Sequence, residues 1–344
     1  MSNSTRSTHS THVARYLLLT ALVIGLATPA SVAAEPVQVT EEQQSALGWW
    51  SPWYIADYAL IGAGITGYVI GGDTAARDDA LIGPVYDPDN PASIFDADAV
   101  SAVYREEGDG EMVPTVWIHR LIGAGATFIA GMEALRWNRG EGSMQGLHDA
   151  FVGYAETVAL TAGVTETFKP MVGRLRPDFA DRARRHHCSM DDAADLGELC
   201  DGYRDRPLSD DRQEAEELLE DGRRSFISGH SSHSFNLLGY TALLVGGHYV
   251  WGDNATGQSR SVGFLAQSAM MAGATYIAAS RLADRRHHRS DVLAGSVVGL
   301  GIANFSYWRR FDRDGNLRNA ERRRTDLSFR RSAEFTGLTV AVQY

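Results

Sequence analysis

Apolar stretches rich in Gly and Ala recur along most of the chain and alternate with charged or Gly/Pro-rich connections. This pattern predicts helices. There is no internal repeat, and the length suits one large helical domain with insertions rather than two domains. We therefore expect an all-α fold, a six-helix up-and-down bundle with long inserted loops. The expected helices cover residues 55–72, 114–137, 146–169, 231–251, 262–281 and 288–308.

Two long connections and the C-terminal segment depart from the helical pattern. Residues 73–112 are rich in Pro, Asp and Gly and predict an extended loop with room for a short helix. Residues 182–224 are charged, and 210–224 within them have the pattern of a surface helix. Residues 311–344 form a C-terminal extension in which 335–344 alternate like a strand. We expect a short C-terminal strand there, packed on the bundle or paired with a neighbour.

Three short clusters of polar residues contain the groups that a phosphate site needs. Phosphoryl transfer depends mainly on positioning and on stabilising the charge of the peripheral oxygens. Lys169, Arg176 and Arg281 supply cations that suit this charge. Ser228 and Gly229 add a hydroxyl and an open backbone N–H at an expected helix start. The full clusters are Lys169 with Arg176-Pro177, Ser228-Gly229-His230, and Ser280-Arg281 with His287 and Asp291.

Two histidines in these clusters can divide the roles of nucleophile and acid. A neutral imidazole in the right tautomer is an accepted covalent nucleophile. Asp291 lies four residues after His287, on the same face if the segment is helical, and is placed to hold one ring nitrogen. His230 then protonates the departing oxygen. This chemistry requires no metal, and His230 with His233 lacks the accompanying carboxylate or Cys of a zinc site.

The expected bundle brings these residues together. In up-and-down order, the third helix ends and the fourth begins at one face, where the fifth also ends and the sixth begins. Lys169, His230, Arg281 and His287 occupy these four places. The topology therefore predicts one site at one end of the bundle.

The order and spacing of the clusters resemble the signature of the type 2 phosphatidic acid phosphatase and vanadium haloperoxidase superfamily. The matching segments are 169–177, 226–230 and 280–291. Ile227 stands where the family usually has Pro, which loosens a rigid turn but removes no chemical group. The helical pattern around the motifs extends the likeness to roughly residues 50–310.

The resemblance implies a bundle of the acid phosphatase and vanadium haloperoxidase type within residues 35–310, with a motif core over 114–308. It implies that His287 is the nucleophile, that Asp291 orients it and that His230 is the general acid. It further implies a phosphate-binding set, which comprises Lys169, Arg176, Ser228, Gly229, His230 and Arg281.

From this resemblance we expect a metal-independent phosphatase without a cofactor, which hydrolyses phosphomonoesters or lipid phosphates through a phosphohistidine intermediate. Its partner would be a phosphorylated small molecule or a lipid phosphate. One alternative is a vanadate-dependent haloperoxidase, in which the same residues hold vanadate as the cofactor. Another is an integral lipid phosphatase of the inner membrane. A binding module that only retains an anion site is disfavoured by the intact set of polar motif residues.

The first 34 residues have the pattern of a signal peptide. Arg6 and Arg15 supply a positive start, residues 16–27 are apolar, and Val32-Ala33-Ala34 is a small-residue cleavage site. The apolar stretch is too short to span a bilayer comfortably. We therefore expect cleavage near Ala34 and export to the periplasm.

Charge and cysteine content agree with an exported protein. The formal net charge of −11 is acidic and argues against nucleic-acid binding. The positive charge is concentrated around the motifs instead. The two cysteines, Cys188 and Cys200, both lie between the first and second motifs. In an oxidising compartment we expect them to form a disulfide that closes a short loop, with free thiols as the alternative.

The pattern leaves open whether the bundle lies in a membrane. Residues 234–252, 262–280 and 292–308 are free of Asp, Glu, Lys and Arg, whereas the other three helices are interrupted by charges. With a cleaved leader, six spanning helices would put the motif face in the cytoplasm, although an exported phosphatase should face outward. We therefore favour a soluble periplasmic bundle, with the inner membrane as the alternative. Membrane association and oligomeric state stay open.

Overall fold

The computed structural model describes residues 52–105, 111–189, 191–318, 325–331 and 336–342. Residues 64–318 form one compact unit, and the remaining described residues belong to a second unit. The expected signal peptide lies outside the described residues. The first unit contains the candidate site.

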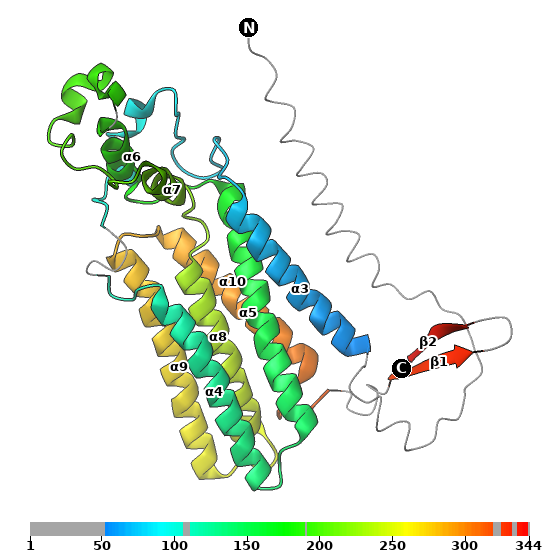
Figure 1. Ribbon diagram of the computed structural model, residues 1–344. Helices are drawn as coiled ribbons and strands as arrows, with labels where there is room; N and C mark the ends of the chain where they lie inside the picture. Colours follow the sequence, from blue (N-terminus) through cyan, green and yellow to red (C-terminus); the bar gives the residue numbers. More distant parts are fainter. Residues whose placement is uncertain (1–51, 106–110, 190, 319–324, 332–335, 343–344) are drawn as a thin grey trace. The chain divides into compact units, whose positions relative to one another are not determined.

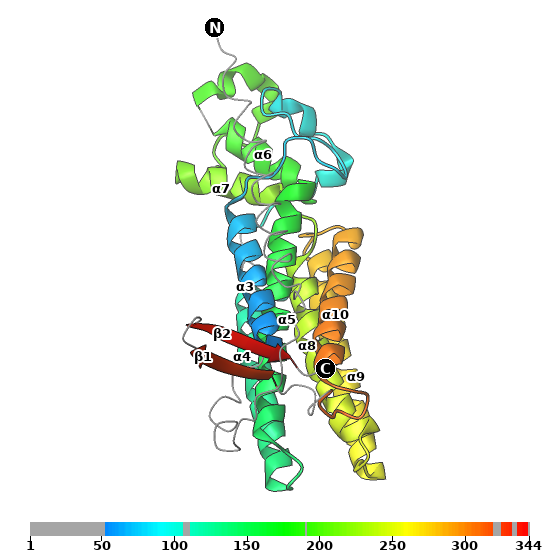
Figure 2. The same ribbon diagram turned by 90° about the vertical axis from the view of Figure 1, so that its right-hand side faces the viewer.

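The regular elements of the first unit are helices, which confirms the all-α prediction for it. Figures 1 and 2 show long helices side by side and shorter helices at one end. The long helices are α3 (Pro52–Asp73), which belongs to this unit from Gly64 on, α4 (Val116–Asn138), α5 (Met144–Val172), α8 (Gly229–Val245), α9 (Gly257–Ala283) and α10 (Arg289–Arg310). The shorter α-helices are α6 (Phe179–Cys188) and α7 (Arg212–Gly222). Short 3₁₀ segments cover Pro91–Ile94, Asp98–Val100 and Asp191–Cys200.

Helix α8 is the central helix of the bundle, in contact with α4, α5, α9 and α10. Its closest packing is against α10, because Gly295 and Gly299 leave no side chain between the two backbones. A Cβ at Gly295 would lie 2.6 Å from the carbonyl oxygen of Ser228. Gly64 and Gly71 likewise let α3 approach the backbone of α5. Small residues thus set the helix spacing, as they do in tightly packed bundles.

The predicted helices are confirmed, with differences at their ends. The stretch expected as one helix over 231–251 is α8 followed by a π-helical turn, Gly246–Trp251. The surface helix expected over 210–224 is α7. Helix α6 was missed, because its sequence is dominated by Arg and His and hides a small apolar face of Phe179, Ala180 and Ala183.

The two long connections pack together into a small subdomain, which we call the cap (residues 74–105 and 174–224). Its apolar cluster joins Tyr86, Phe95 and Val100 from the first connection to Leu175 and Phe179 from the second. Cys188 and Cys200 form a disulfide within the cap. The predicted disulfide is therefore confirmed, and the connections are more ordered than the sequence pattern indicated.

Replacing both cysteines by serine should loosen the cap without unfolding the bundle. A disulfide between residues 12 apart raises the free energy of unfolding by about 3 kcal/mol, because it lowers the conformational entropy of the unfolded chain. We expect hydrogen exchange of residues 174–224 to accelerate in the Cys188→Ser/Cys200→Ser protein, while α8 keeps its protection. Reduction of the unaltered protein serves as the control and should give the same result. Equal exchange with and without the disulfide would show that the apolar cluster alone holds the cap.

The C-terminal segment forms a two-stranded antiparallel hairpin in the second unit. Strand β1 (Thr325–Arg331) pairs with β2 (Thr336–Val342), and Phe329 lies opposite Leu338. Strand β2 overlaps the stretch 335–344, where a single strand was expected. Its partner β1 was not predicted, because 325–331 is polar and Arg-rich.

Candidate active site

The three motifs are held together by backbone hydrogen bonds. Gly173 ends α5 in the left-handed conformation with φ 62°, which turns the chain away from the helix after Lys169. The N–H of Arg176 then donates to Gly222 O at 2.8 Å, and Ser225 N–H donates to Arg174 O at 2.9 Å. These bonds join the first motif to the second.

A further backbone bond joins the second motif to the third. The N–H of Ser228 donates to Asp291 O at 3.1 Å. Ser228 is the N-cap of α8, and Asp291 lies in the first turn of α10. The starts of the two helices are therefore fixed against each other.

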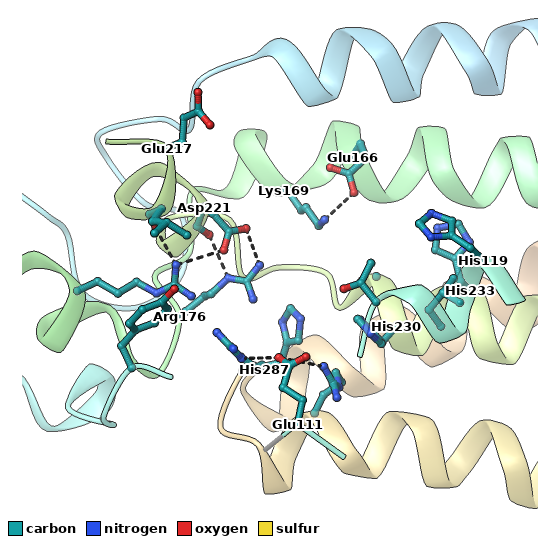
Figure 3. Close-up of a pocket in the computed structure, with 18 of the residues that line it drawn as sticks. Glu111, His119, Glu166, Lys169, Arg176, Glu217, Asp221, His230, His233 and His287 are labelled. Carbon is teal, nitrogen blue, oxygen red and sulfur yellow. Dashed lines mark hydrogen bonds and ion pairs between the residues drawn. The ribbon is translucent and has the colours of Figure 1, made fainter. Parts of the chain in front are cut away.

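Between the cap and this end of the bundle lies a cavity of about 540 Å³. Figure 3 shows its polar lining, to which α4, α5, α7 and α8 contribute side chains. Ser228 and Asp291 are fully buried and do not line the cavity. The predicted site residues that do line it are Lys169, Arg176, Gly229, His230, Arg281 and His287.

The ring of His287 is oriented by the backbone of Ser225. The Nδ1 atom lies 2.8 Å from the carbonyl oxygen of Ser225, so it carries the proton and donates this bond. The Nε2 atom then keeps its lone pair. Asp291 Oδ2 is 3.8 Å from Nδ1, too far for a hydrogen bond. The expectation that Asp291 holds the ring directly is therefore corrected, because the Ser225 carbonyl occupies that position.

Asp291 instead provides a fixed negative charge beside the ring. Its Oδ1 accepts a hydrogen bond from Arg174 at 2.6 Å, and its Oδ2 accepts bonds from the Ser225 hydroxyl at 2.6 Å and from His288 N–H at 3.0 Å. Burial alone would raise the pKa of Asp291, but His287, Ser225 and Arg174 outweigh burial and lower it. The carboxylate stays ionised and caps α10 at the same time.

Ser225 and Arg174 were not assigned to the site from the sequence. Ser225 lies three residues before Ser228, just outside the quoted motif, and it uses its hydroxyl and its carbonyl for different partners. Arg174 lies two residues before Arg176, off the fixed positions of the motif. Spacing alone gives no signal for either contact, since both depend on how α5 ends.

Burial keeps His287 neutral. Burial lowers its pKa, Arg176 and Lys169 add to the effect, and the nearby Asp291 opposes it, so that the pKa is about 4. The neutral imidazole is the form required of a nucleophile. His287 therefore has the protonation state and the tautomer for attack through Nε2 at neutral pH.

His230 lies in the first turn of α8 and lines the same cavity. Its buried Nε2 atom has no hydrogen-bond partner among the described residues. Burial lowers its pKa to about 2, and the charges of Arg281, Arg176 and Lys169 add to that effect. The ring is neutral, and it lines the cavity beside the cations.

Each predicted phosphate-binding cation has a carboxylate partner. Lys169 Nζ lies 2.5 Å from Glu166 Oε1. Arg176 donates from Nη2 to Asp221 Oδ1 at 2.8 Å and from Nε to Asp221 O at 3.0 Å. These contacts hold the two cations from one side and leave further N–H groups of each for an anion.

Arg281 is held in the same manner by the start of α4 and the end of α9. Its Nη2 donates to Val113 O at 2.6 Å and to Asp284 Oδ2 at 2.7 Å. Glu111 Oε1 lies 3.8 Å from Nη1 and 2.8 Å from Arg286 Nε. The guanidinium is therefore fixed in place before any ligand binds.

Asp221 is a site residue that the sequence did not reveal. It ends α7 in the cap and binds both Arg176 and Arg182. Burial opposes its ionisation, but Arg176, Arg182 and Lys169 outweigh burial and lower its pKa. It lies in a connection with many acidic residues, so nothing in the sequence distinguishes it from surface charge.

Metal ligation has no obvious candidate in the described part of the chain. No group of three or more His, Cys, Asp or Glu residues there has the geometry to hold a metal ion. The histidines and cations that line the cavity instead suit a tetrahedral oxyanion.

Comparison with known proteins identifies the family. Residues 150–314 match the family model of the PAP2 superfamily, and this span contains all three motifs. Residues 150–314 therefore form a domain of the PAP2 superfamily. The family predicted from the motifs is confirmed.

Several curated proteins are similar to this chain. Lipid phosphate phosphatase 2 of Arabidopsis thaliana is 31% identical over 169 residues, 48% of this chain and 52% of that protein. Diacylglycerol pyrophosphate phosphatase 1 of Saccharomyces cerevisiae is 34% identical over 167 residues, 48% of this chain and 53% of that protein. A putative phosphatidate phosphatase of Drosophila melanogaster is 32% identical over 159 residues, 44% of this chain and 40% of that protein. The matched regions thus span about half of each relative or less. No solved structure matches the chain.

Proposed function

We propose that the protein is a phosphatase that hydrolyses phosphomonoesters, lipid phosphates among them, through a phosphohistidine at His287. The observation that carries this proposal is the cavity in which His287 and His230 face the same space as Lys169, Arg176 and Arg281. The relatives named as lipid phosphate and phosphatidate phosphatases support the same class of substrate.

The geometry supports a two-step mechanism. In the first step, His287 Nε2 forms a bond to phosphorus while the bond to the ester oxygen breaks. His230, having taken up a proton, transfers it to that oxygen, and the alcohol leaves. In the second step, neutral His230 accepts a proton from water, the water oxygen attacks phosphorus, and the bond to His287 breaks. The proton that His230 accepted leaves with the product as dihydrogen phosphate, so both histidines are again neutral.

The cations and Asp291 stabilise different charges during these steps. Lys169, Arg176 and Arg281 bind the peripheral phosphoryl oxygens, whose charge is largest in the transition state. Phosphorylation of Nε2 makes the ring cationic, because Nδ1 keeps its proton. The ionised Asp291 lies close enough to stabilise that cation.

A haloperoxidase is not favoured. Vanadate is a tetrahedral oxyanion, so Lys169, Arg176 and Arg281 would hold it as they would hold phosphate. When bound, it would activate peroxide for halide oxidation. The named relatives are phosphatases, so we propose vanadate as an inhibitor of this protein rather than as its cofactor.

A substrate screen tests the proposed function. Purified full-length protein is assayed for phosphate release from soluble phosphomonoesters and from lipid phosphates, with and without vanadate. Halide oxidation with peroxide and vanadate is measured in parallel. We expect phosphate release that vanadate inhibits. Release from neither type of substrate, or halide oxidation alone, would contradict the phosphatase assignment.

The value of kcat/KM should fall at low pH because His287 is protonated, and at high pH because the substrate loses a proton. In the free protein both histidines are neutral at pH 7, so the proton that His230 donates must arrive with the phosphate ester. A phosphate ester loses its second proton near pH 6. We expect a plateau from about pH 4.5 to 6 and a tenfold loss per pH unit above it. Below about pH 4, protonation of Nε2 removes the nucleophile.

Substrates with different second pKa values provide the control for this profile. The high-pH limb should move with the pKa of the ester, while the low-pH limb should stay near pH 4. A high-pH limb that is the same for all esters would show that an enzyme group, and not the substrate, supplies the proton.

We further propose that the bundle lies in a membrane, the alternative that the sequence analysis ranked second. Residues Ile55–Asp73 and Gly257–Ala283 are long and apolar enough to cross a bilayer, and only 17% of the most apolar 18-residue stretch in each is buried. On α9 and α10, Leu265 is 70% exposed and Leu293 is 67% exposed. Apolar surface on this scale marks contact with lipid or another protein.

The interior of the bundle has the opposite character. Glu156 on α5 is fully buried and accepts hydrogen bonds from Ser306 and Arg310 on α10, both at 2.8 Å. Ser232 and Asn236 of α8 are also fully buried. Polar groups inside and apolar groups outside are the pattern of helices packed within a bilayer. Carbonate extraction should leave the protein in the membrane fraction, and release into the soluble fraction would contradict this location.

The disulfide supports a site that faces an oxidising compartment, because it lies in the cap that encloses the cavity. With six spanning helices, an outward-facing site requires α3 to begin on the cytoplasmic side, so this proposal departs from the cleaved leader that the sequence analysis expects. We expect an impermeant thiol reagent to label Asp89→Cys in the cap of intact cells. Asn254→Cys, between α8 and α9, should react only after permeabilisation. The reverse pattern would place the site in the cytoplasm, and labelling of both in intact cells would favour the soluble periplasmic bundle.

A further inference from the structure

The cap contains a short exposed loop of mainly apolar residues, 81–85, which we call the apolar loop. The side chains of Leu81 and Val85 are 60% and 53% exposed, and that of Ile82 is exposed as well. Gly83 has a φ of 96°, and a Cβ there would meet no other part of the described chain, so the loop turns in open space. These residues do not line the cavity, so their exposed apolar surface needs another explanation.

Backbone hydrogen bonds fix the start of the apolar loop at the end of α5. The last carbonyl groups of a helix have no partners within the helix. The N–H of Arg77 donates to Pro170 O at 3.2 Å, and the N–H of Leu81 donates to Val172 O at 2.9 Å. The loop therefore satisfies the carbonyls of the last turn of α5 and lies at the level of that turn.

The neighbouring helix, α3, ends at the same cap. Its apolar stretch, which is long enough to cross a bilayer, ends at Asp73. Arg224 of the cap donates hydrogen bonds to the carbonyls of Gly71 at 2.5 Å and of Gly72 at 3.0 Å. Figures 1 and 2 show the ends of α3 and α5 side by side below the cap. If these two helices cross a bilayer, the apolar loop lies at its surface.

Exposed apolar side chains continue from the loop onto α5. Met171 lies between the two residues whose carbonyls bind the loop, and its side chain is exposed. Phe168, one turn earlier, is exposed too. The loop thus extends an apolar helix face that we propose to lie in lipid. This continuity favours lipid, rather than a protein partner, as the surface that covers the loop.

The acidic residues just before the loop do not oppose contact with a membrane. Asp79 pairs with Arg77 at 2.7 Å, and Asp78 pairs with Arg223 at 2.8 Å. The two pairs add no net charge to this side of the loop. An apolar tip with a polar border is suited to the boundary between head groups and acyl chains.

We propose that the apolar loop contacts the membrane, with Leu81, Ile82 and Val85 at the boundary between head groups and acyl chains on the side of the site. The inference rests on the proposed location of the bundle and adds a lipid contact made by the cap. The contact holds the cap at a fixed height above the bilayer. The cavity beneath the cap then stays at the level of the lipid head groups.

Fluorescent probes on single introduced cysteines test this contact. The two cysteines of the chain are joined in the disulfide, so a thiol-reactive dye attaches only to the new residue. Full-length Ile82→Cys and Val85→Cys proteins are labelled and placed in phosphatidylcholine nanodiscs, one protein per disc. We expect lipids that carry a nitroxide near the head group to quench both probes strongly. Iodide in the buffer should quench them weakly.

Two further positions calibrate the measurement. Asp89→Cys is exposed in the same connection, beyond the buried Tyr86, and should be quenched by iodide and not by the lipid. Leu293→Cys is exposed near the start of α10 and should be quenched by the lipid, because the bundle lies in the bilayer. Every labelled protein should release phosphate from a soluble ester as fast as the unaltered protein, which shows that it is folded.

A variant without the apolar side chains tests what drives the contact. When Leu81→Ser and Val85→Ser are added to Ile82→Cys, quenching of the probe should shift from the lipid to iodide. Quenching by the lipid that persists in this variant would show that the dye, and not the loop, enters the membrane, and would overturn the proposal.

The outcomes separate this contact from the proposals on which it rests. Lipid quenching at Leu293→Cys but at neither loop position would overturn the contact and leave the bundle in the membrane. Lipid quenching at none of these positions would overturn both the contact and the location of the bundle. Phosphate release from the soluble ester tests the phosphatase assignment independently of either.

Discussion

Replacement of His287 by Ala should lower kcat by about 10⁴-fold or more on every substrate. The change removes the atom that forms the covalent bond, and no other described side chain has the same position relative to the cations. Asp291, Ser225 and Arg174 would keep their mutual hydrogen bonds, so the fold should persist. The measurement is phosphate release under saturating substrate.

Arg289→Ala is the matched control for this variant, because Arg289 is an exposed residue of the same segment that does not line the cavity. It should keep the activity of the unaltered protein. Residual turnover above about one per cent in His287→Ala, with a correctly folded protein, would exclude His287 as the nucleophile.

Replacement of His230 by Ala should lower kcat by about 10²- to 10⁴-fold for esters of ordinary alcohols. The loss arises because an alkoxide leaves poorly without a proton. An aryl ester such as 4-nitrophenyl phosphate has a leaving group that is stable without protonation. For this ester we expect a much smaller loss in the first step, measured as the release of nitrophenol in a single turnover.

The two histidine variants therefore distinguish the two roles. His287→Ala should lose activity on alkyl and aryl esters alike, whereas His230→Ala should lose it mainly on alkyl esters. An equal loss on both esters in His230→Ala would show that His230 binds phosphate rather than acting as the acid.

The helices and the meeting of the motifs could be predicted from the sequence. Apolar stretches interrupted by charge define helices directly, and up-and-down order places the ends of α5 and α9 beside the starts of α8 and α10. The motif spacing identified the family, because the residues that bind one phosphate group must keep fixed offsets within each segment.

The details of the site depend on contacts between segments, which spacing does not encode. A carboxylate four residues after a histidine suggests a pair, but the Ser225 carbonyl takes the ring nitrogen because the second motif lies across the start of α10. Asp221 reaches Arg176 only because the cap folds over the bundle end. Helix α6 escaped detection because its buried face includes Arg182 and His186.

The location of the bundle could not be decided from the sequence for a related reason. In the sequence, Asp, Glu and Arg within three of the helices counted against their crossing a membrane. The structure buries several of these charges in pairs, such as Glu156 with Arg310. The exposed apolar residues of α9 and α10 become visible only once packing shows which faces are covered.

The most direct test of the central claim is the detection of phosphate on His287. Protein mixed with a ³²P-labelled ester and quenched within a turnover should carry label that is stable to base and labile to acid, on the peptide that contains His287. His287→Ala should carry none. Rapid turnover without any labelled peptide, or label on another residue, would contradict the proposed mechanism.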